Sequence, residues 1–325
     1  MYSLHFYGQM LADSVRMDAY AAALRRVVKP DSVVMDLGSG PGVFALLACK
    51  LGARRVYAVE PENVIGLARE AAEANGLADR IEFLEDLSFN ITVQEPASVI
   101  ISDLRGVLPW FQQHLPAIKD ARERLLTRGG TLIPHRDTVW AAPVEAHDQY
   151  DNLVRPWQHN NFGLDLSCAT RHTTNRWRKT RIEPKQLLSE PICWTMIDYY
   201  EVDDPNATAE ISWRVERKGT AHGVAVWFDS HLVDDIGFSN HPRERELIYG
   251  NGFFPFSEPI AVSQGEHIKL RLSARFVQGD YVWRWDTNFF AGDDERTLKA
   301  SFKQSTFFGV PLSRKQLLEI REDDA

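Results

Sequence analysis

The chain has 325 residues, of which 44% are hydrophobic and 25% charged, a composition typical of a folded protein large enough for two domains. Its formal net charge of −8 argues against nonspecific binding to nucleic acid, which requires a concentration of Lys and Arg. There is no apolar run of about eighteen residues and no signal-peptide pattern, so the sequence predicts no membrane span and a cytoplasmic location.

The first part of the chain alternates helical patterns with short apolar runs. Apolar positions at helical spacing predict a helix over residues 11–28, and the run at 33–37 predicts a strand buried on both faces. Further helices are predicted over 44–51, 61–74 and 115–127, the last closed by Gly129 and Gly130. Strands are predicted over 56–59, 81–84 and 97–102. Strands that alternate with helices imply a parallel sheet with right-handed crossovers.

The pattern changes after residue 134. Shorter alternating runs at 138–142, 210–215, 223–228 and 267–276 are separated by Gly, Pro, Asp and Asn, which predicts an antiparallel sheet or barrel. Residues 302–311 are predicted to form a strand or turn near the end of the barrel. We therefore predict two domains, at residues 1–134 and 135–325. The polar and aromatic segment at about 150–187 has little periodicity and is too long for an ordinary loop, so we expect it to have a partner.

A strand followed by a glycine-rich turn is the most informative local pattern. Gly38, Gly40 and Gly42 permit positive φ angles and close backbone approach, and the helix that follows favours an anionic or polar ligand at its N-terminus. Glu60 ends the next apolar run about 20 residues downstream, where an acidic side chain accepts hydrogen bonds from ribose hydroxyls. A plain structural turn is the alternative to a nucleotide-like ligand.

Two ligand classes fit this turn. Dinucleotide enzymes use the spacing G-x-G-x-x-G, whereas Gly42 lies only two positions after Gly40, and Pro41 has no N–H for a pyrophosphate. The sequence GSGPG after Asp36 resembles motif I of S-adenosylmethionine-dependent methyltransferases, whose ligand carries no phosphate. We favour S-adenosylmethionine as the cofactor. The alternative is a dinucleotide oxidoreductase, which binding of NAD would support.

A Rossmann-like half followed by a β-barrel half resembles the type I protein arginine methyltransferases, and local stretches match over nearly the whole chain. Residues 10–16 resemble the family's segment between its N-terminal helix and the sheet. This resemblance implies that Arg16 binds the methionyl carboxylate of S-adenosylmethionine through two parallel hydrogen bonds, with Met10 near the sulfonium.

The family's cofactor motifs also match around the strand ends. The resemblance implies cofactor contacts at Asp36, Gly38, Gly40, Gly42 and Glu60. The segment just past the third strand lies where such enzymes contact the adenine, which adds Asp86, Leu87 and Ser88.

The dimerisation arm of the family is matched within the unexplained segment. Residues 161–168, which begin at Asn161, resemble this arm, and residues 183–187 resemble its far end. A symmetric homodimer with an arm at about 150–187 is therefore implied.

The acceptor side departs from the family pattern. Two glutamates of the family grip the substrate guanidinium, but here Asp103 replaces the first and Gln112, nine positions on, replaces the second. Arg105 adds a positive charge beside them. The family's threonine–histidine–tryptophan loop is replaced by residues 247–249.

The lid helix of the family is largely missing as well. The chain begins where that tyrosine-rich helix would end, and Tyr2, Phe6 and Tyr7 are left to do part of its work.

Methyl transfer from a sulfonium is an in-line displacement, so the protein mainly aligns acceptor, methyl carbon and sulfur. The candidate catalytic residues are Asp103, Gln112 and His114, of which Asp103 is the nearest carboxylate for removing a proton. The altered hairpin fits an acceptor with a single positive or neutral nitrogen or oxygen, on a protein, peptide or small molecule, better than a guanidinium. The second hypothesis is a catalytically impaired cofactor-binding or dimeric scaffold.

Cysteines and histidines predict no metal site. Three scattered cysteines suit buried thiols in a reducing compartment better than a disulfide framework or zinc site. The histidines show no metal-ligand spacing, so we expect no metal.

Overall fold

The computed structural model describes residues 3–159, 162–292 and 296–309. The predictions made for Tyr2, Asn161 and residues 310–311 concern positions outside these ranges. The chain forms two compact units, each assembled from segments distant in sequence. The first unit takes the described residues of Met1–Val139, Met196–Pro205 and Phe228–Tyr249, and the second takes the remainder.

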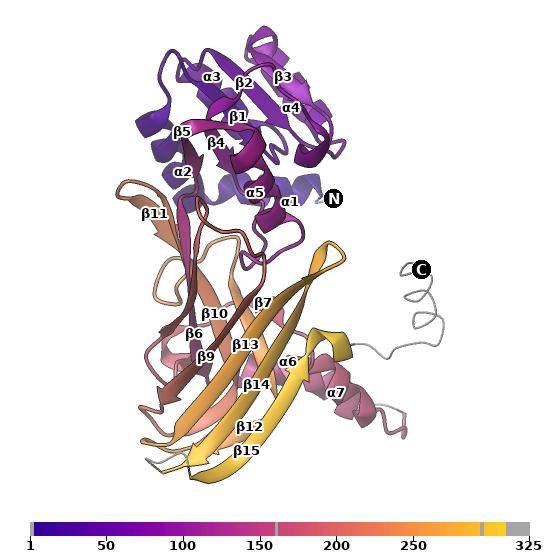
Figure 1. Cartoon of the computed structure of the whole chain (residues 1–325). Coiled ribbons are helices and arrows are strands. Elements are labelled where there is room, and N and C mark those ends of the chain that lie inside the picture. The colour runs from indigo at the N-terminus through magenta and orange to yellow at the C-terminus, as the bar shows by residue number, and fades with distance from the viewer. Residues whose placement is uncertain (1–2, 160–161, 293–295, 310–325) are drawn as a thin grey trace, which may run out of the picture. The chain divides into compact units, whose positions relative to one another are not determined.

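A five-stranded parallel sheet forms the centre of the first unit (Figure 1). Its strand order is β3-β2-β1-β4-β5, with β1 (Val33–Leu37), β2 (Arg55–Val59), β3 (Ile81–Leu84), β4 (Ala97–Ser102) and β5 (Leu126–Ile133). β1 is buried along its whole length, which confirms the interpretation of its continuous apolar run. The order reverses between β1 and β4, and ligands of such sheets bind at the carboxyl ends of the strands on either side of that reversal.

Helices of the first unit precede or connect these strands. They are α1 (Leu4–Ala12), α2 (Ser14–Val27), α3 (Val43–Lys50), α4 (Ile65–Ala74) and α5 (His114–Arg124). The predicted helix over residues 11–28 is confirmed as α2 except at its start, where Asp13 separates it from α1. The Asp13 carboxylate accepts a hydrogen bond from the Arg16 backbone N–H at 3.3 Å and so caps a separate helix, α2.

The prediction that Gly129 and Gly130 close a helix was wrong. α5 ends at Arg124, and both glycines lie inside β5. This strand pairs in parallel with β4, Val99 lying opposite Thr131, so the pairing of the sheet edge determines its conformation.

Antiparallel strands make up most of the second unit and run on into the first. One sheet has the order β7-β12-β10-β6-β8, with β11 paired to β10, and another has the order β15-β14-β13-β9. Their bounds are β6 (Arg136–Val144), β7 (Arg178–Thr180), β8 (Ile192–Asp198), β9 (Ala207–Arg214), β10 (Gly219–Val233), β11 (Ile236–Ser239), β12 (Asn251–Val262), β13 (His267–Val277), β14 (Asp280–Ala291) and β15 (Thr297–Ser305). The four alternating runs predicted from the sequence lie in β6, β9, β10 and β13.

Aromatic side chains join the two sheets of the second unit. The Trp285 indole N–H on β14 donates to the Pro255 carbonyl on β12 at 3.0 Å, and Phe254 packs against Trp177, Trp283 and Trp285. These rings are core packing, and they anchor the sheets to each other.

The segment expected to form an arm contains two helices, α6 (His147–Gln158) and α7 (Thr170–Thr173). α6 packs through Tyr150, Leu153 and Val154 into the core of the second unit. Between the helices, Phe162, Leu164 and Leu166 are 98%, 65% and 40% exposed. The arm therefore presents apolar side chains that this chain does not cover.

Candidate functional site

The glycine turn follows β1 and lies beside the end of β2. The backbone N–H groups of Gly38 and Ser39 donate to the Val59 carbonyl, both at 2.9 Å. The Glu60 carboxylate accepts from the Gly40 N–H at 2.9 Å and from the Glu62 N–H at 3.0 Å. Glu60 thus supports the turn while lining a cavity beside it. Burial raises the pKa of this carboxyl, although the two backbone donors oppose that shift.

Only glycine fits at two positions of the turn. Gly38 and Gly40 have φ angles of 73° and 51°, which disfavour a side chain. A Cβ atom at Gly38 would lie 2.2 Å from the Leu104 side chain, and one at Gly40 would lie 2.9 Å from the Tyr7 ring. Tyr7 of α1 therefore lies against the turn.

Two cavities of the first unit meet at this turn. The larger has a volume of about 470 Å³ and the smaller about 50 Å³, and both are lined by Tyr7, Met10, Gly38 and Asp103. Arg16 and Gly40 line the smaller one. The larger one extends to the other predicted residues, namely Glu60, Asp86, Leu87, Ser88, Gln112 and His114. The structure therefore brings together all the predicted site residues except Asp36 and Gly42.

Asp36 lies behind the turn rather than on a cavity wall. Its carboxylate accepts a hydrogen bond from the Ala45 backbone N–H at 2.9 Å and so caps the first turn of α3. The side chain is 1% exposed, and burial raises its pKa to about 7. This contact gives Asp36 a structural role, and the cofactor contact expected of it stays a prediction.

Gly42 is likewise structural. Its φ angle is 79°, and a Cβ atom there would lie 2.7 Å from Ala68 on α4. The glycine permits close packing of α3 against α4 and does not line the cavities.

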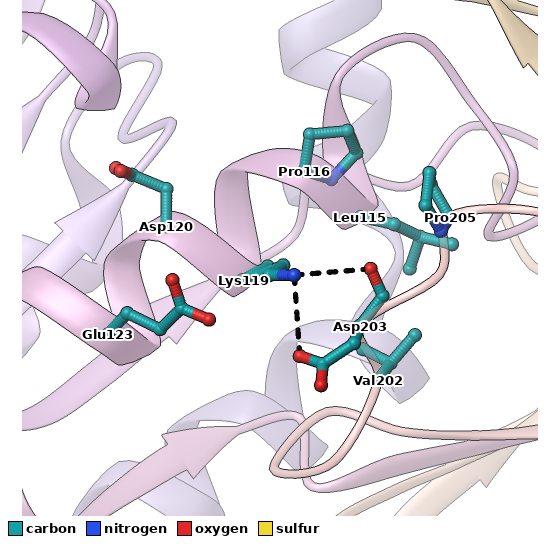
Figure 2. Close-up of a pocket in the computed structure, with 8 residues that line it drawn as sticks. All are labelled: Leu115, Pro116, Lys119, Asp120, Glu123, Val202, Asp203 and Pro205. Atoms are coloured by element: carbon teal, nitrogen blue, oxygen red, sulfur yellow. Dashed lines mark hydrogen bonds and ion pairs between the residues drawn. The ribbon is translucent and has the colours of Figure 1, made fainter.

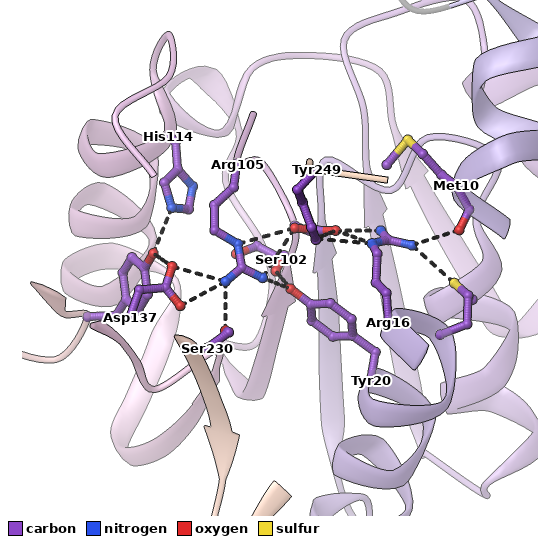
Figure 3. Close-up of polar contacts among 12 residues, drawn as sticks. Met10, Arg16, Tyr20, Ser102, Arg105, His114, Asp137, Ser230 and Tyr249 are labelled. Carbon is purple, nitrogen blue, oxygen red and sulfur yellow. Dashed lines mark hydrogen bonds and ion pairs between the residues drawn. The ribbon is translucent and has the colours of Figure 1, made fainter. Parts of the chain in front are cut away.

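Arg16 of α2 forms a buried ion pair with Asp103, which follows β4. Figure 3 shows the Arg16 guanidinium among its polar contacts, with Tyr249 on one side and Met10 on the other. The Arg16 Nε donates to Asp103 Oδ2 at 2.6 Å, and its Nη2 lies 2.5 Å from the same oxygen. The Tyr249 hydroxyl donates to this oxygen at 2.6 Å and accepts from Arg16 Nε at 3.1 Å. Tyr249, from the replaced loop, therefore completes the site.

Asp103 has no capacity left for a further donor. Arg105 contacts its Oδ1 through Nε and Nη2, both at 3.3 Å, in addition to the three donors on Oδ2. A carboxylate offers about four lone-pair sites, so five donors saturate it. Burial alone would raise the pKa of Asp103, but Arg16 and Arg105 outweigh it and hold the pKa below the ordinary value. Asp103 is a poor proton acceptor at neutral pH.

The Arg105 guanidinium is fully buried and satisfied on every side. Its Nη1 donates to both oxygens of Asp137, at 2.8 and 3.0 Å, and to the Ser230 hydroxyl at 2.7 Å. Its Nη2 donates to the Tyr20 hydroxyl as well as to Asp103. The rings of Phe228, Phe238 and Tyr249 lie 5.1 to 5.8 Å from the guanidinium carbon.

His114 is buried rather than on the surface. Its Nε2 lies 3.1 Å from the Tyr199 hydroxyl, which donates to Asp137 at 2.6 Å. Because the tyrosine proton is committed to Asp137, Nε2 of His114 must donate, which leaves Nδ1 as an acceptor. Burial lowers the pKa of His114 to about 3, so the imidazole is neutral at physiological pH.

Gln112 is the exposed member of the three catalytic candidates. It has a φ angle of 43°, which is uncommon for a residue with a side chain, and it lines the larger cavity. Its amide can donate and accept hydrogen bonds, but it carries no charge to offset that of a guanidinium.

S-adenosylmethionine fits the donor set of these walls. Arg16 Nη1 contacts the Met10 carbonyl at 3.3 Å and the Met17 sulfur at 3.1 Å, and a carboxylate is a much stronger acceptor than that thioether. The Ser39 hydroxyl is buried in the smaller cavity and has no hydrogen-bond partner among the described residues. The Asp86 carboxylate holds its loop through the Leu87 N–H at 2.7 Å and Asn90 at 2.8 Å, which orders the wall predicted to face the adenine.

A separate surface cavity of about 220 Å³ lies between α5 and residues 202–205 (Figure 2). Its one lysine, Lys119, is engaged by Asp203, through the carboxylate at 3.5 Å and the carbonyl at 3.4 Å. We assign no chemistry to this cavity.

Sequence reasoning missed four members of the buried cluster, Tyr20, Asp137, Tyr199 and Ser230. They reach Arg105 or His114 from α2, β6, the turn after β8, and β10, and no local spacing relates these positions.

Over the described ranges, no three His, Cys, Asp or Glu side chains gather so as to hold a metal ion. Within those same ranges, none of the helices has the length and apolarity needed to span a membrane.

Comparison with known proteins places both halves among methyltransferase sequences. Residues 135–288 match the family described as the arginine methyltransferase oligomerization subdomain. Residues 20–132 match the ribosomal protein L11 methyltransferase (PrmA) family.

Curated relatives match most of the chain. Protein arginine N-methyltransferase 1.1 of Arabidopsis thaliana is 25% identical over 279 residues, which cover 83% of this chain and 71% of the relative. Protein arginine N-methyltransferase PRMT10 of the same plant is 25% identical over 343 residues, which cover 94% of this chain and 89% of the relative.

Solved structures share the fold. That of Arabidopsis thaliana protein arginine methyltransferase 10 has a TM-score of 0.81 at 22% identity and covers 93% of this chain and 97% of its own. That of the Trypanosoma brucei PRMT1 enzyme–prozyme heterotetrameric complex with AdoHcy has a TM-score of 0.82 at 21% identity and covers 94% and 98%.

Proposed function

We propose that this chain is an S-adenosylmethionine-dependent methyltransferase that resembles the protein arginine methyltransferases. It transfers a methyl group to a nitrogen or oxygen atom of a protein, peptide or small-molecule acceptor. The observation that carries the proposal is the meeting of the glycine turn, Glu60 and Arg16 around adjoining cavities where the strand order of the sheet reverses.

Each end of the cofactor has a candidate partner on the cavity walls. Bound S-adenosylmethionine supplies an electrophilic methyl group on a sulfonium. Arg16 holds the methionyl carboxylate, Glu60 accepts from the ribose hydroxyls, and Met10 lies beside the sulfonium. Residues 86–88 contact the adenine. These roles use residues that line the two cavities.

The chain contributes to the reaction mainly through alignment. Gln112 is proposed to position the acceptor through its amide, because it lines the larger cavity. Asp103 lines both cavities, and its proposed part is to hold Arg16, Arg105 and Tyr249 in place at their wall. His114 is proposed to accept a hydrogen bond at Nδ1 rather than to act as a base, in keeping with its low pKa.

A homodimer in the cytoplasm completes the proposal. The apolar side chains exposed on the arm need a covering surface, and the matched family is an oligomerization subdomain. The exposed thiol of Cys168 suits a reducing compartment.

Mass spectrometry of products made from isotopically labelled S-adenosylmethionine tests the activity. Arginine-rich peptides, peptides without arginine and a small-molecule extract serve as acceptors, and label in any acceptor supports the proposal. A chain that binds neither S-adenosylmethionine nor S-adenosylhomocysteine in calorimetry would reject it, together with the role of Arg16.

A catalytically impaired scaffold of the same fold is the second candidate. The saturation of Asp103 by Arg16, Arg105 and Tyr249 favours it, because that carboxylate cannot receive an acceptor without rearrangement. A scaffold of this kind binds the cofactor but labels no acceptor, which separates it from the enzyme.

A further inference from the structure

We propose that Arg105 determines the class of acceptor, so that the site takes an electrically neutral nucleophile and excludes a protonated guanidinium. This inference rests on the proposed function, because it concerns the acceptor side of the same cavity. It is carried by the four charged side chains that meet at the end of β4.

Those four charges cancel. Arg16 and Arg105 carry two positive charges, and Asp103 and Asp137 carry two negative ones, joined by contacts of 2.5 to 3.3 Å. All four side chains are 5% exposed or less, so water screens them weakly. A cation that entered beside Asp103 would meet no net negative charge, and its desolvation would go uncompensated.

Hydrogen bonding leads to the same conclusion independently of charge. A guanidinium is recognised best by a carboxylate that offers two acceptors in a plane. Both oxygens of Asp103 are already occupied, one by Arg16 and Tyr249 and the other by Arg105. An incoming guanidinium would have to displace one of the protein's own arginines.

The buried cluster already contains a recognised guanidinium. Arg105 has two carboxylates, two hydroxyls and three aromatic rings around it. Arg105 thus occupies the position at which the two carboxylates would otherwise bind the guanidinium of a substrate arginine. The remaining carboxylates of the cavity wall, Glu60, Glu62 and Asp86, follow β2 and β3 on the side proposed for the cofactor.

Two peptides that differ only in the charge of one side chain test the proposal. One carries a central arginine and the other carries citrulline, its neutral isostere, and their affinities are compared by calorimetry in the presence of S-adenosylhomocysteine. We expect the wild type to bind the citrulline peptide at least as tightly as the arginine peptide. A tenfold or greater preference for arginine, or efficient ω-methylarginine formation, would overturn the proposal.

Two variants shift the charge in opposite directions. Arg105→Met leaves the cluster net negative and should move the affinity ratio toward arginine by tenfold or more. Asp137→Asn leaves it net positive and should move the ratio toward citrulline by a similar factor. A merely structural role would weaken both peptides equally and leave the ratio unchanged. Arg54→Met, which removes a charge from an exposed ion pair with Glu95, is the matched control.

The variants also cover the remaining outcomes. If Arg105→Met does not fold, Asp137→Asn decides, because it keeps Arg105 in place. If the wild type binds neither peptide, a folded Arg105→Met that still fails to bind arginine overturns the proposal. Binding of S-adenosylhomocysteine is measured separately. A wild type that does not bind it would contradict the proposed function and leave the argument about charge untouched.

Discussion

Asp36→Asn should stabilise the chain at alkaline pH. The pKa of Asp36 rises from 3.8 to about 7 on folding because the side chain is buried behind the glycine turn. The folded state therefore binds this proton more tightly than the unfolded state, and stability falls as the pH rises from about 4 through about 7. At about 1.4 kcal/mol for each unit of pKa, the full effect is at most about 4 kcal/mol.

The amide of asparagine keeps the hydrogen bond to the Ala45 N–H and carries no charge. We expect the variant to exceed the wild type in free energy of unfolding by about 1 to 4 kcal/mol near pH 8, and to match it near pH 3, below the unfolded pKa of the carboxyl. Urea unfolding of both proteins at several pH values measures this. A variant less stable than the wild type at both pH values would refute the reasoning.

Three further predictions concern the cofactor and the arm. Glu60→Gln turns an amide donor toward the Gly40 or Glu62 N–H, and S-adenosylhomocysteine affinity should fall about 10- to 100-fold in calorimetry, whereas Asp36→Asn should leave it unchanged. Arg16→Lys cannot bind Asp103 and also keep the donor that Arg16 Nη1 holds ready for the cofactor carboxylate, so the same affinity should fall about tenfold or more; equal affinity would remove Arg16 from the cofactor site. Asp substitutions at both Leu164 and Leu166 should convert a dimer into a monomer in sedimentation analysis, and Met196→Asp, on an exposed position away from the arm, should not.

Local patterns located three strands of the parallel sheet as the structure has them. Apolar runs bounded by turn residues located β1, β3 and β4 to the residue, because strands buried on both faces leave a continuous signal. The same runs placed Gly38, Glu60 and Asp103 at strand ends, and parallel strands bring such ends to one edge of the sheet.

Position within a strand distinguishes Asp36 from the residues that line the cavities. Asp36 precedes the last residue of β1, whereas Glu60 and Asp103 follow the last residues of their strands. A residue inside a buried strand packs against a helix, and the signal for a cofactor ligand is weaker there than at the strand end. The helix break at Asp13 carried a capping signal, an acid directly before Ser14, that the continuous apolar spacing masked.

The buried cluster lay beyond reach of local patterns. Arg105 meets Tyr20, Asp137 and Ser230 across separations of 85, 32 and 125 residues. Their proximity depends on β6 and β10 contributing to the same compact unit as the parallel sheet. The sequence showed that a positive charge stood beside Asp103 but not that two carboxylates and two hydroxyls neutralise and hold it.

Calorimetric titration with S-adenosylhomocysteine, with NAD as the comparison, tests the central claim most directly. The account predicts saturable binding of S-adenosylhomocysteine at one site per chain, weakened by Arg16→Lys and by Glu60→Gln, and no binding of NAD. Binding of NAD in its place, or of neither ligand, would contradict it.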